Sequence, residues 1–235
     1  KTIKFKKRWY TFTSWIEIMI EIKLCGLKEP SHIKVAFNLG IEYIGLVLYK
    51  KSPRYLNGET ARSLISNSPP GIKKVGLVVD PTNDFLDTIS DIDLDMLQLH
   101  GSETLDRVKE IKSKVNVSLI KAVGVKDKKD LELVEKYAEI ADQILIDAKP
   151  NDNSLPGGNG IKFDWKILED ITWDFPWFLA GGLNESNIDD ALFATKAKKV
   201  DLSSGVEDSH GKKSIVKITN FVKKIRKYEE NLNVG

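Results

Sequence analysis

Short apolar runs alternate with amphipathic segments along most of this sequence, and each apolar run is followed by a segment with helical spacing. The apolar runs predict strands at residues 20–25, 43–49, 74–80, 95–101, 117–124, 143–148, 177–182 and 200–205. The segments between them predict helices at residues 30–40, 58–67, 83–90, 102–114, 128–141, 163–170, 184–196 and 212–230. A regular alternation of strands and helices predicts a parallel sheet with right-handed crossovers.

The number of strand-helix units indicates how the sheet is arranged. Eight units in about 210 residues, without a linker or a shift in composition, favour a single closed (β/α)8 TIM barrel over two doubly wound domains. No GxGxxG pattern follows the first strand, so a dinucleotide-binding fold has little support. We expect an N-terminal extension at residues 1–18, either accessory or an artefact of the start site. The barrel is expected at 19–228 and a C-terminal tail at 229–235.

Composition and charge narrow the class of protein. With 235 residues, of which 41% are hydrophobic and 30% charged, the chain can bury a large core. Residues 1–18 hold five basic residues against Glu17, which leaves 31 basic and 33 acidic residues for the rest. The barrel is therefore not a basic protein, and we expect no nucleic-acid partner.

No apolar run approaches the roughly 20 residues of a membrane span, so no membrane partner is expected either. A single cysteine cannot form an internal disulfide, so a cytoplasmic location is predicted.

Polar residues at strand ends are the first candidates for chemistry, because catalytic groups of this fold lie at the carboxyl ends of the strands. Cys25 ends the first predicted strand, and strand alternation gives Lys23 the same face. The same reasoning selects Gln98 and His100 on the fourth strand, Asp147 on the sixth, and Asp201 and Ser203 on the eighth. A lone cysteine on an apolar strand is usually a buried small hydrophobic residue. Cys25 lies at a strand end, however, and a carboxylate lies at another strand end, so a catalytic role for Cys25 is favoured.

Two glycine-containing loops predict a phosphate site. Gly181 and Gly182 end the seventh strand, and Ser204 and Gly205 follow the eighth. Glycine lets backbone N–H groups approach an anion, and a helix N-terminus adds partial positive charge. The loops after strands seven and eight are the usual phosphate site of this fold. The predicted partner is thus a small phosphorylated substrate.

The motifs KLCGL, KSPRY, LQLHGSE, LIDA, GGNGIKFDW, LAGGLNESNI and VDLSSGVE occur in this order. Together they resemble the phosphoribosylanthranilate isomerases of tryptophan biosynthesis, from about residue 20 to residue 226. The resemblance implies an Amadori rearrangement of N-(5-phosphoribosyl)anthranilate to 1-(2-carboxyphenylamino)-1-deoxyribulose 5-phosphate. That chemistry needs neither a metal nor a cofactor. The sequence leaves open whether the chain is a monomer or a homodimer.

The resemblance also implies roles for particular residues. Cys25 is the expected general base and Asp147 the expected general acid, so Asp147 must hold a proton near neutral pH. We expect Lys23 and the helix N-termini around the mouth to favour the Cys25 thiolate. Arg54 of KSPRY is expected to bind the anthranilate carboxylate through its guanidinium fork. We further expect His100 to line the pocket, Asp201 to orient the substrate's amine or hydroxyl groups, and the long sixth loop at 148–158 to act as a lid.

Two other readings remain open at this point. A related barrel isomerase of histidine biosynthesis performs similar chemistry on a two-phosphate substrate, but it has an aspartate where this chain has Cys25. The chain could instead be a non-catalytic phosphate-binding barrel that residues 1–18 dock to nucleic acid or a membrane, since that segment mixes basic and aromatic residues.

Overall fold

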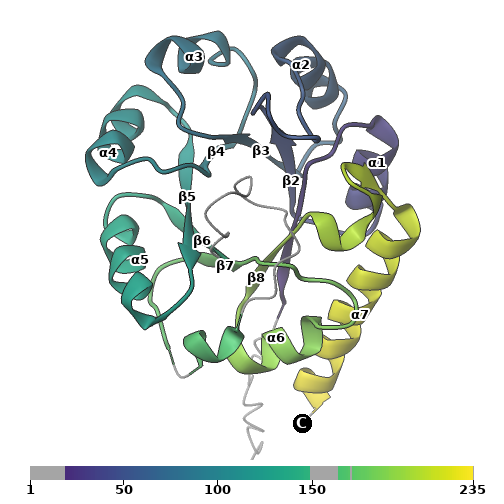
Figure 1. The fold of residues 1–235 in the computed structure, drawn as a ribbon. Coiled ribbons are helices and arrows are strands. Elements are labelled where there is room, and N and C mark those ends of the chain that lie inside the picture. The colour runs from purple at the N-terminus through teal and green to yellow at the C-terminus, as the bar shows by residue number, and fades with distance from the viewer. Residues whose placement is uncertain (1–18, 149–163, 170, 235) are drawn as a thin grey trace, which may run out of the picture.

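Eight parallel strands close into a barrel in the computed structural model, which describes residues 19–148, 164–169 and 171–234 (Figure 1). The strands are β1 (Glu21–Cys25), β2 (Tyr43–Val47), β3 (Lys73–Val78), β4 (Met96–Leu99), β5 (Ser118–Val125), β6 (Gln143–Ala148), β7 (Trp177–Leu179) and β8 (Lys199–Leu202). β8 pairs with β1, which closes the ring. The predicted TIM barrel is confirmed.

The helices form a layer outside the strands (Figure 1). They are α1 (Pro30–Asn38), α2 (Gly58–Ser66), α3 (Asn83–Thr88), α4 (Leu105–Lys114), α5 (Leu131–Ala138), α6 (Ile188–Thr195) and α7 (Ile215–Val234). The 3₁₀ turn η1 (Lys128–Asp130) precedes α5. Asn57, Thr82 and Thr104 begin three of these helices, because each side-chain oxygen accepts a hydrogen bond from a backbone N–H of the first turn.

The sixth predicted helix, at residues 163–170, is wrong. In its place the chain makes one 3₁₀ turn, η2 (Trp165–Leu168), which Asp164 caps through the backbone N–H of Lys166. Leu168 is the buried residue of this turn, so the segment lacks the continuous apolar stripe that holds a longer helix against a barrel. At the other end of the chain, α7 runs to Val234, through residues that the sequence assigned to the tail.

The connection between β8 and α7 also differs from the prediction. The expected strand at 200–205 ends at Leu202, and the 3₁₀ turn η3 (Ser204–Val206) follows it. A two-stranded hairpin, β9 (Glu207–Ser209) and β10 (Lys212–Lys213), then leads to α7. This hairpin brings charged side chains close to the mouth of the barrel.

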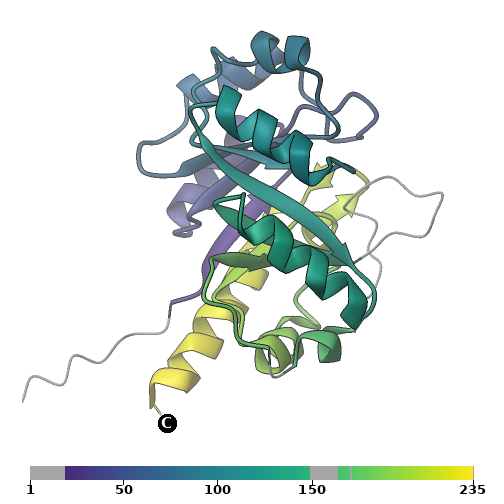
Figure 2. The same cartoon turned by 90° about the vertical axis from the view of Figure 1, so that its left-hand side faces the viewer.

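The core has two parts. Inside the barrel, a cluster around Tyr43, Leu145 and Phe178 fills the space below a second cluster of Cys25, Val47 and Leu77. A larger cluster of mostly aliphatic residues lies between the strands and the helices, which wrap the barrel as seen from the side (Figure 2). The inward side chains of β1 and β8 meet at Lys23 and Asp201, as strand alternation predicts.

Two predicted features lie outside the described residues: the extension at 1–18 and nearly all of the expected lid at 148–158. Within the described part of the chain, no helix has the length and apolar character needed to cross a membrane.

Candidate active site

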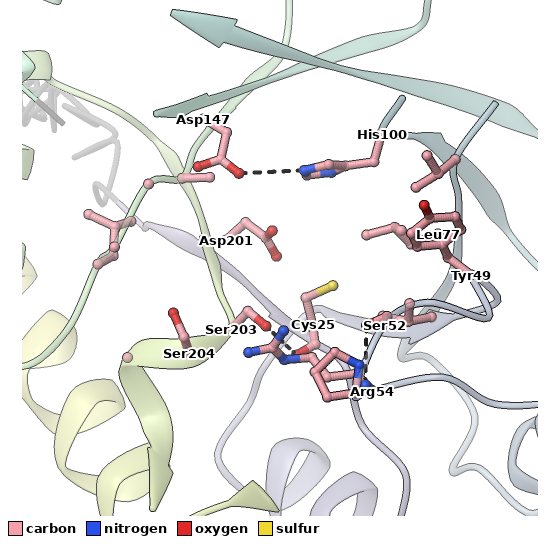
Figure 3. Close-up of a pocket in the computed structure, with 18 of the residues that line it drawn as sticks. Cys25, Tyr49, Ser52, Arg54, Leu77, His100, Asp147, Asp201, Ser203 and Ser204 are labelled. Carbon is pink, nitrogen blue, oxygen red and sulfur yellow. Dashed lines mark hydrogen bonds and ion pairs between the residues drawn. The ribbon is translucent and has the colours of Figure 1, made fainter. Parts of the chain in front are cut away.

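A cavity opens at the carboxyl ends of the strands, where the loops lead into the helices (Figure 3). The residues predicted from the sequence that line it are Cys25, Arg54, His100, Asp147, Gly181, Gly182, Asp201, Ser203, Ser204 and Gly205. They come from strands and loops that are far apart in the sequence. The barrel therefore brings together a thiol, carboxylates, a guanidinium and two glycine-containing loops.

Lys23 and Gln98, which the sequence also selected as substrate-binding residues, lie one layer below the cavity. Both are fully buried. Lys23 Nζ donates a hydrogen bond to Asp201 Oδ1 at 2.9 Å, and Gln98 Nε2 lies 2.7 Å from His100 Nδ1. Each thus contacts a lining residue from behind, and neither side chain reaches the cavity surface.

The Cys25 thiol is held in a narrow, buried place at the end of β1. A Cβ added to Gly45 on the neighbouring strand β2 would lie 2.9 Å from Cys25 Sγ, so only glycine leaves room for the thiol there. Burial raises the pKa of Cys25, and the positive charge of Lys23 only partly opposes this effect. The expectation that Lys23 would favour the thiolate is right in direction, but burial outweighs it in this structure.

Lys23 itself is held as a cation. Burial disfavours its charge, but the carboxylate of Asp201 and the nearby Cys25 outweigh burial and raise the pKa of Lys23. Asp201 is 9% exposed and lies between Cys25 and Asp147 in the close-up (Figure 3). Burial raises the pKa of Asp201, and the charge and hydrogen bond of Lys23 oppose this effect, so the lysine favours the charged form of the carboxyl group.

Asp147 and His100 face each other across one side of the cavity (Figure 3). His100 Nε2 lies 3.5 Å from Asp147 Oδ2. Gln98 holds the opposite ring nitrogen of His100 from below, so the imidazole has a fixed orientation. The carboxyl group of Asp147 on β6 is therefore positioned by His100, which directly follows β4.

Arg54 is buried at the edge of the cavity and is paired with Glu207 of β9. Its Nε donates to Glu207 Oε1 at 2.7 Å and its Nη2 to Glu207 Oε2 at 2.8 Å. The stem of Arg54 crosses Gly26, where an added Cβ would lie 2.4 Å from Arg54 Cδ. Gly26 also has a φ of +82°, which favours glycine. The glycine after Cys25 is thus needed both for the turn and for the arginine above it.

Glu207 remains ionised well into acid. Burial alone would raise its pKa, but hydrogen bonds from Arg54 and Lys213 outweigh burial and hold the pKa of Glu207 at about 2. Lys213 Nζ lies 2.7 Å from Glu207 Oε1 and also donates to the backbone carbonyl of Ser203 at 2.9 Å. These contacts tie the hairpin to the end of β8.

The two glycine-containing loops meet on the side of the cavity formed by β7 and β8. Gly181 and Gly182 have φ values of +90° and +68°, a left-handed conformation that favours glycine. An added Cβ on Gly205 would lie 1.9 Å from the backbone oxygen of Leu183. The loops are therefore packed backbone to backbone, and both contribute residues to the lining of the cavity.

Several lining residues and one supporting residue were not selected from the sequence. The lining residues are Val47, Tyr49, Ser52, Pro53, Leu77, Val79, Ala180, Leu183 and His210. Ser52 and Pro53 lie within the KSPRY run, so that motif carried a signal for them. The apolar residues look like any other strand residue, and His210 is in a hairpin that has no sequence pattern. Glu207, which supports Arg54 from behind, lies in VDLSSGVE but was not given a role.

No group of histidine, cysteine, aspartate and glutamate side chains suited to a metal ion lies within residues 19–148, 164–169 and 171–234.

Comparisons with known proteins agree with this geometry. A family model described as N-(5'-phosphoribosyl)anthranilate (PRA) isomerase matches residues 22–224. The N-(5'-phosphoribosyl)anthranilate isomerase of Cereibacter sphaeroides is 44% identical over 88% of this chain and 99% of that protein. Its counterpart in Paracoccus denitrificans is 43% identical over 86% of this chain and 95% of that protein.

Solved structures give the same result. The crystal structure of phosphoribosyl anthranilate isomerase from Thermotoga maritima is 33% identical, with a TM-score of 0.79 over 89% of this chain and 100% of that chain. Another phosphoribosyl anthranilate isomerase structure, in complex with reduced 1-(o-carboxyphenylamino)-1-deoxyribulose 5-phosphate, is 31% identical with a TM-score of 0.75 and the same coverage. The chain belongs to the N-(5'-phosphoribosyl)anthranilate isomerase family.

Proposed function

We propose that the chain isomerises N-(5'-phosphoribosyl)anthranilate to 1-(2-carboxyphenylamino)-1-deoxyribulose 5-phosphate in tryptophan biosynthesis, with Cys25 as general base and Asp147 as general acid. The observation that carries the proposal is that one cavity is lined by the Cys25 thiol, the Asp147 carboxyl group, Arg54 and the two glycine-containing loops. Family membership supports the same reaction. A relative's structure holds a reduced form of the expected product, which has a carboxylate at one end and a phosphate at the other.

The reaction requires two proton transfers at different atoms. Asp147 gives its proton to the ribose ring oxygen, the bond from that oxygen to C1′ breaks, and the anthranilate nitrogen forms a Schiff base with C1′. The Cys25 thiolate then removes the proton from C2′, which gives an enolamine. This enolamine tautomerises to the ketone product when C1′ gains a proton and the hydroxyl on C2′ loses one. An acid and a base on different sides of the sugar suffice for this sequence.

The positions of the two groups suit these roles. Cys25 ends β1 and Asp147 lies on β6, and Asp201 lies between them in the cavity (Figure 3). A sugar held over Asp201 would have Cys25 on one side and Asp147 on the other. In this arrangement Asp201 accepts a hydrogen bond from the substrate's amine or a hydroxyl group, while Lys23 compensates its charge from below.

The supporting residues have indirect roles in the proposal. Lys23 stabilises both Asp201 and the thiolate form of Cys25, although it does not touch the substrate. Gln98 orients His100, and His100 in turn orients Asp147. These residues form the layer below the reacting groups, where they fix the geometry of the acid and the base.

The substrate's two anions would be held at different sides of the mouth. The phosphate would bind the backbone N–H groups of Gly182 and of the Ser204–Gly205 turn, because these glycines line the cavity and let an anion approach the backbone. The anthranilate carboxylate would pair with Arg54. The ribose then spans the cavity between these sides.

Turnover measured on two variants tests the proposal. Cys25→Ala should keep the barrel folded, because a small side chain replaces a small one, and should lose about 10²–10⁴-fold in kcat. Asp147→Asn keeps the size of the side chain but cannot supply the proton, so kcat should fall by a similar factor while substrate still binds. Full activity in Cys25→Ala would remove the thiol from the mechanism. A raised KM with unchanged kcat in Asp147→Asn would make Asp147 a binding residue.

The same assay separates the alternatives. If the wild-type chain instead turned over the two-phosphate substrate of the histidine-pathway isomerase, and not phosphoribosylanthranilate, the proposed substrate would be wrong. If neither substrate reacted while inorganic phosphate bound, the reading as a non-catalytic phosphate-binding barrel would hold.

A further inference from the structure

The Arg54 side chain is held in place along its whole length, from its aliphatic stem to its guanidinium group. Its stem lies over Gly26, its guanidinium pairs with both oxygens of Glu207, and the side chain is only 5% exposed. We propose that Glu207 is a positioning residue, which holds Arg54 in the orientation that binds the substrate's carboxylate. This inference rests on the function proposed above.

The shape of the guanidinium explains how Arg54 can serve two carboxylates. Its five N–H donors lie in one plane and form two edges, each of which can pair with a carboxylate. Glu207 occupies the edge formed by Nε and Nη2. The edge formed by Nη1 and Nη2 is not used by Glu207, and Arg54 lines the cavity. Glu207 thus fixes the plane and the direction in which the second edge is presented to a planar carboxylate.

Glu207 can position Arg54 because its own carboxylate is fixed by further hydrogen bonds. Its Oε1 accepts from Lys213 Nζ at 2.7 Å, and its Oε2 accepts from the backbone N–H of Gly211 at 2.9 Å. Gly211 in turn packs against the loop that carries Arg54, since an added Cβ there would lie 2.9 Å from the backbone oxygen of Pro53. The β9–β10 hairpin therefore connects the eighth loop to the second loop through one carboxylate.

The charges of this group favour an anionic ligand. Arg54 and Lys213 are two basic groups around the single carboxylate of Glu207. Burial lowers the pKa of Lys213, but its pairing with Glu207 opposes this effect and favours the charged form of the lysine, so the cluster favours a net positive charge. All three side chains are at least nine-tenths buried. Glu207 is not among the residues that line the cavity, which fits a role exerted through Arg54 rather than on the substrate itself.

The experiment compares two ligands across matched variants. The probes are reduced 1-(o-carboxyphenylamino)-1-deoxyribulose 5-phosphate and the same molecule without the ring carboxylate. Glu207→Gln should weaken binding of the first about 10–100-fold, because a misdirected guanidinium loses the two-point contact, and should change binding of the second less than about threefold. With substrate, KM should rise by a larger factor than kcat falls.

Glu103→Gln is the matched control. Glu103 is another buried glutamate, paired with Lys121 at 2.8 Å, but it lies beside β4 and β5 and does not contact Arg54. This variant should keep the preference for the carboxylate-bearing ligand even if it lowers stability. If Glu207→Gln alone does not fold, adding Lys213→Met removes the second cation and restores the net charge of the cluster, and the double variant is measured instead.

The Arg54→Ala variant separates two hypotheses, namely that Glu207 positions Arg54 and that Arg54 binds the substrate's carboxylate. If Arg54→Ala keeps the full preference for the carboxylate-bearing ligand, Arg54 does not bind the carboxylate, and that part of the proposed function fails. If Arg54→Ala abolishes the preference but Glu207→Gln retains it, the function stands and the positioning role of Glu207 is overturned. Glu207 acts through Arg54 as proposed if Glu207→Gln weakens the preference for the carboxylate-bearing ligand in the wild type. In the Arg54→Ala variant, the same substitution should then have no further effect on that preference.

Discussion

At the residue level, the Cys25 thiol depends on a neighbour that has no side chain. Gly45 lies beside Cys25 on the adjacent strand, and a Cβ at this position would come within 2.9 Å of Sγ and 3.0 Å of the Cys25 backbone. Because the Cys25 backbone is fixed in the β1–β2 ladder, the thiol must move to make room. Gly45→Ala should therefore displace the proposed base and lower kcat by at least about tenfold, since small errors in the position of a reacting group are costly.

Gly76→Ala is the control for this prediction. Gly76 is a glycine on β3, where an added Cβ would meet the flexible side chain of Leu94 at 2.6 Å. This variant is crowded in a similar way but away from the cavity, so kcat should stay close to that of the wild type. Equal losses of kcat in both variants would mean that the effect of Gly45→Ala comes from general damage to the sheet.

The sequence identified the site residues that are unusual for their position in a strand, and it missed those that look like ordinary strand residues. Cys25, Asp147 and Asp201 are polar residues at strand positions where a barrel core has aliphatic ones, so strand alternation was enough to select them. Gly45 could not be selected, because a glycine within a strand indicates that another group packs closely against the backbone, but the sequence does not identify that group. Lys23 shows a further limit: alternation predicts which face a side chain takes, but not how deep in the barrel it lies.

At the level of elements, the sequence predicted the eight strands and seven of the helices, because each has an apolar pattern several residues long. The β9–β10 hairpin was missed because strands of three and two residues have no measurable period. The helix at 163–170 was wrong because the apolar residues of FDWKILED have a helical spacing over too few residues to distinguish an α-helix from a 3₁₀ turn. Both errors fall in connections between the strands, where contacts with the rest of the barrel determine the path of the chain.

The seventh and eighth loops should behave as one element. Gly205 packs so closely on Leu183 that an added Cβ would overlap the backbone oxygen of Leu183, and a backbone group cannot swing aside as a side chain can. Gly205→Ala should therefore push the two loops apart and weaken binding of inorganic phosphate by at least about tenfold, because the two sets of N–H groups no longer converge. Titration of the protein with phosphate, followed by calorimetry, measures this.

Gly58→Ala serves as the comparison for that measurement. Gly58 begins α2, and its added Cβ would meet only the end of the Arg62 side chain, at 3.1 Å and away from the cavity. Phosphate affinity should be unchanged in this variant. If Gly205→Ala also binds phosphate with normal affinity, the phosphate does not bind at the junction of the two loops.

At the level of the whole molecule, ion pairs buried within and above the barrel join segments that are far apart in the sequence. Lys23 and Asp201 join β1 to β8 where the barrel closes, and Lys121 and Glu103 join β5 to the loop after β4. Arg54, Glu207 and Lys213 join the second loop to the last hairpin. Sequence alone predicted that these strands would be neighbours, but it could not predict which charges would meet, since side chains far apart in the sequence find partners only in the closed barrel.

The Glu207 cluster should make the stability of the protein sensitive to acid. Its folded pKa of about 2 lies below the ordinary value of about 4.3, so Glu207 binds a proton more readily in the unfolded chain. Its contribution to stability is complete above about pH 5.5 and is lost progressively as the pH falls towards 2. The difference corresponds to about 3 kcal/mol in the free energy of unfolding. Urea denaturation of the wild type at pH 7 and pH 3 should show most of this loss.

Glu207→Gln isolates that contribution, because glutamine has no proton to gain. The variant should be less stable than the wild type at pH 7, where Arg54 and Lys213 lose their counter-charge, and its free energy of unfolding should fall less steeply between pH 7 and pH 3. Asp91→Asn is the surface control. Asp91 pairs with Arg62 in the open, where water screens the interaction, so its removal should leave the pH dependence close to that of the wild type. Identical slopes in the wild type and Glu207→Gln would show that the buried carboxylate is not the group that couples acid to unfolding.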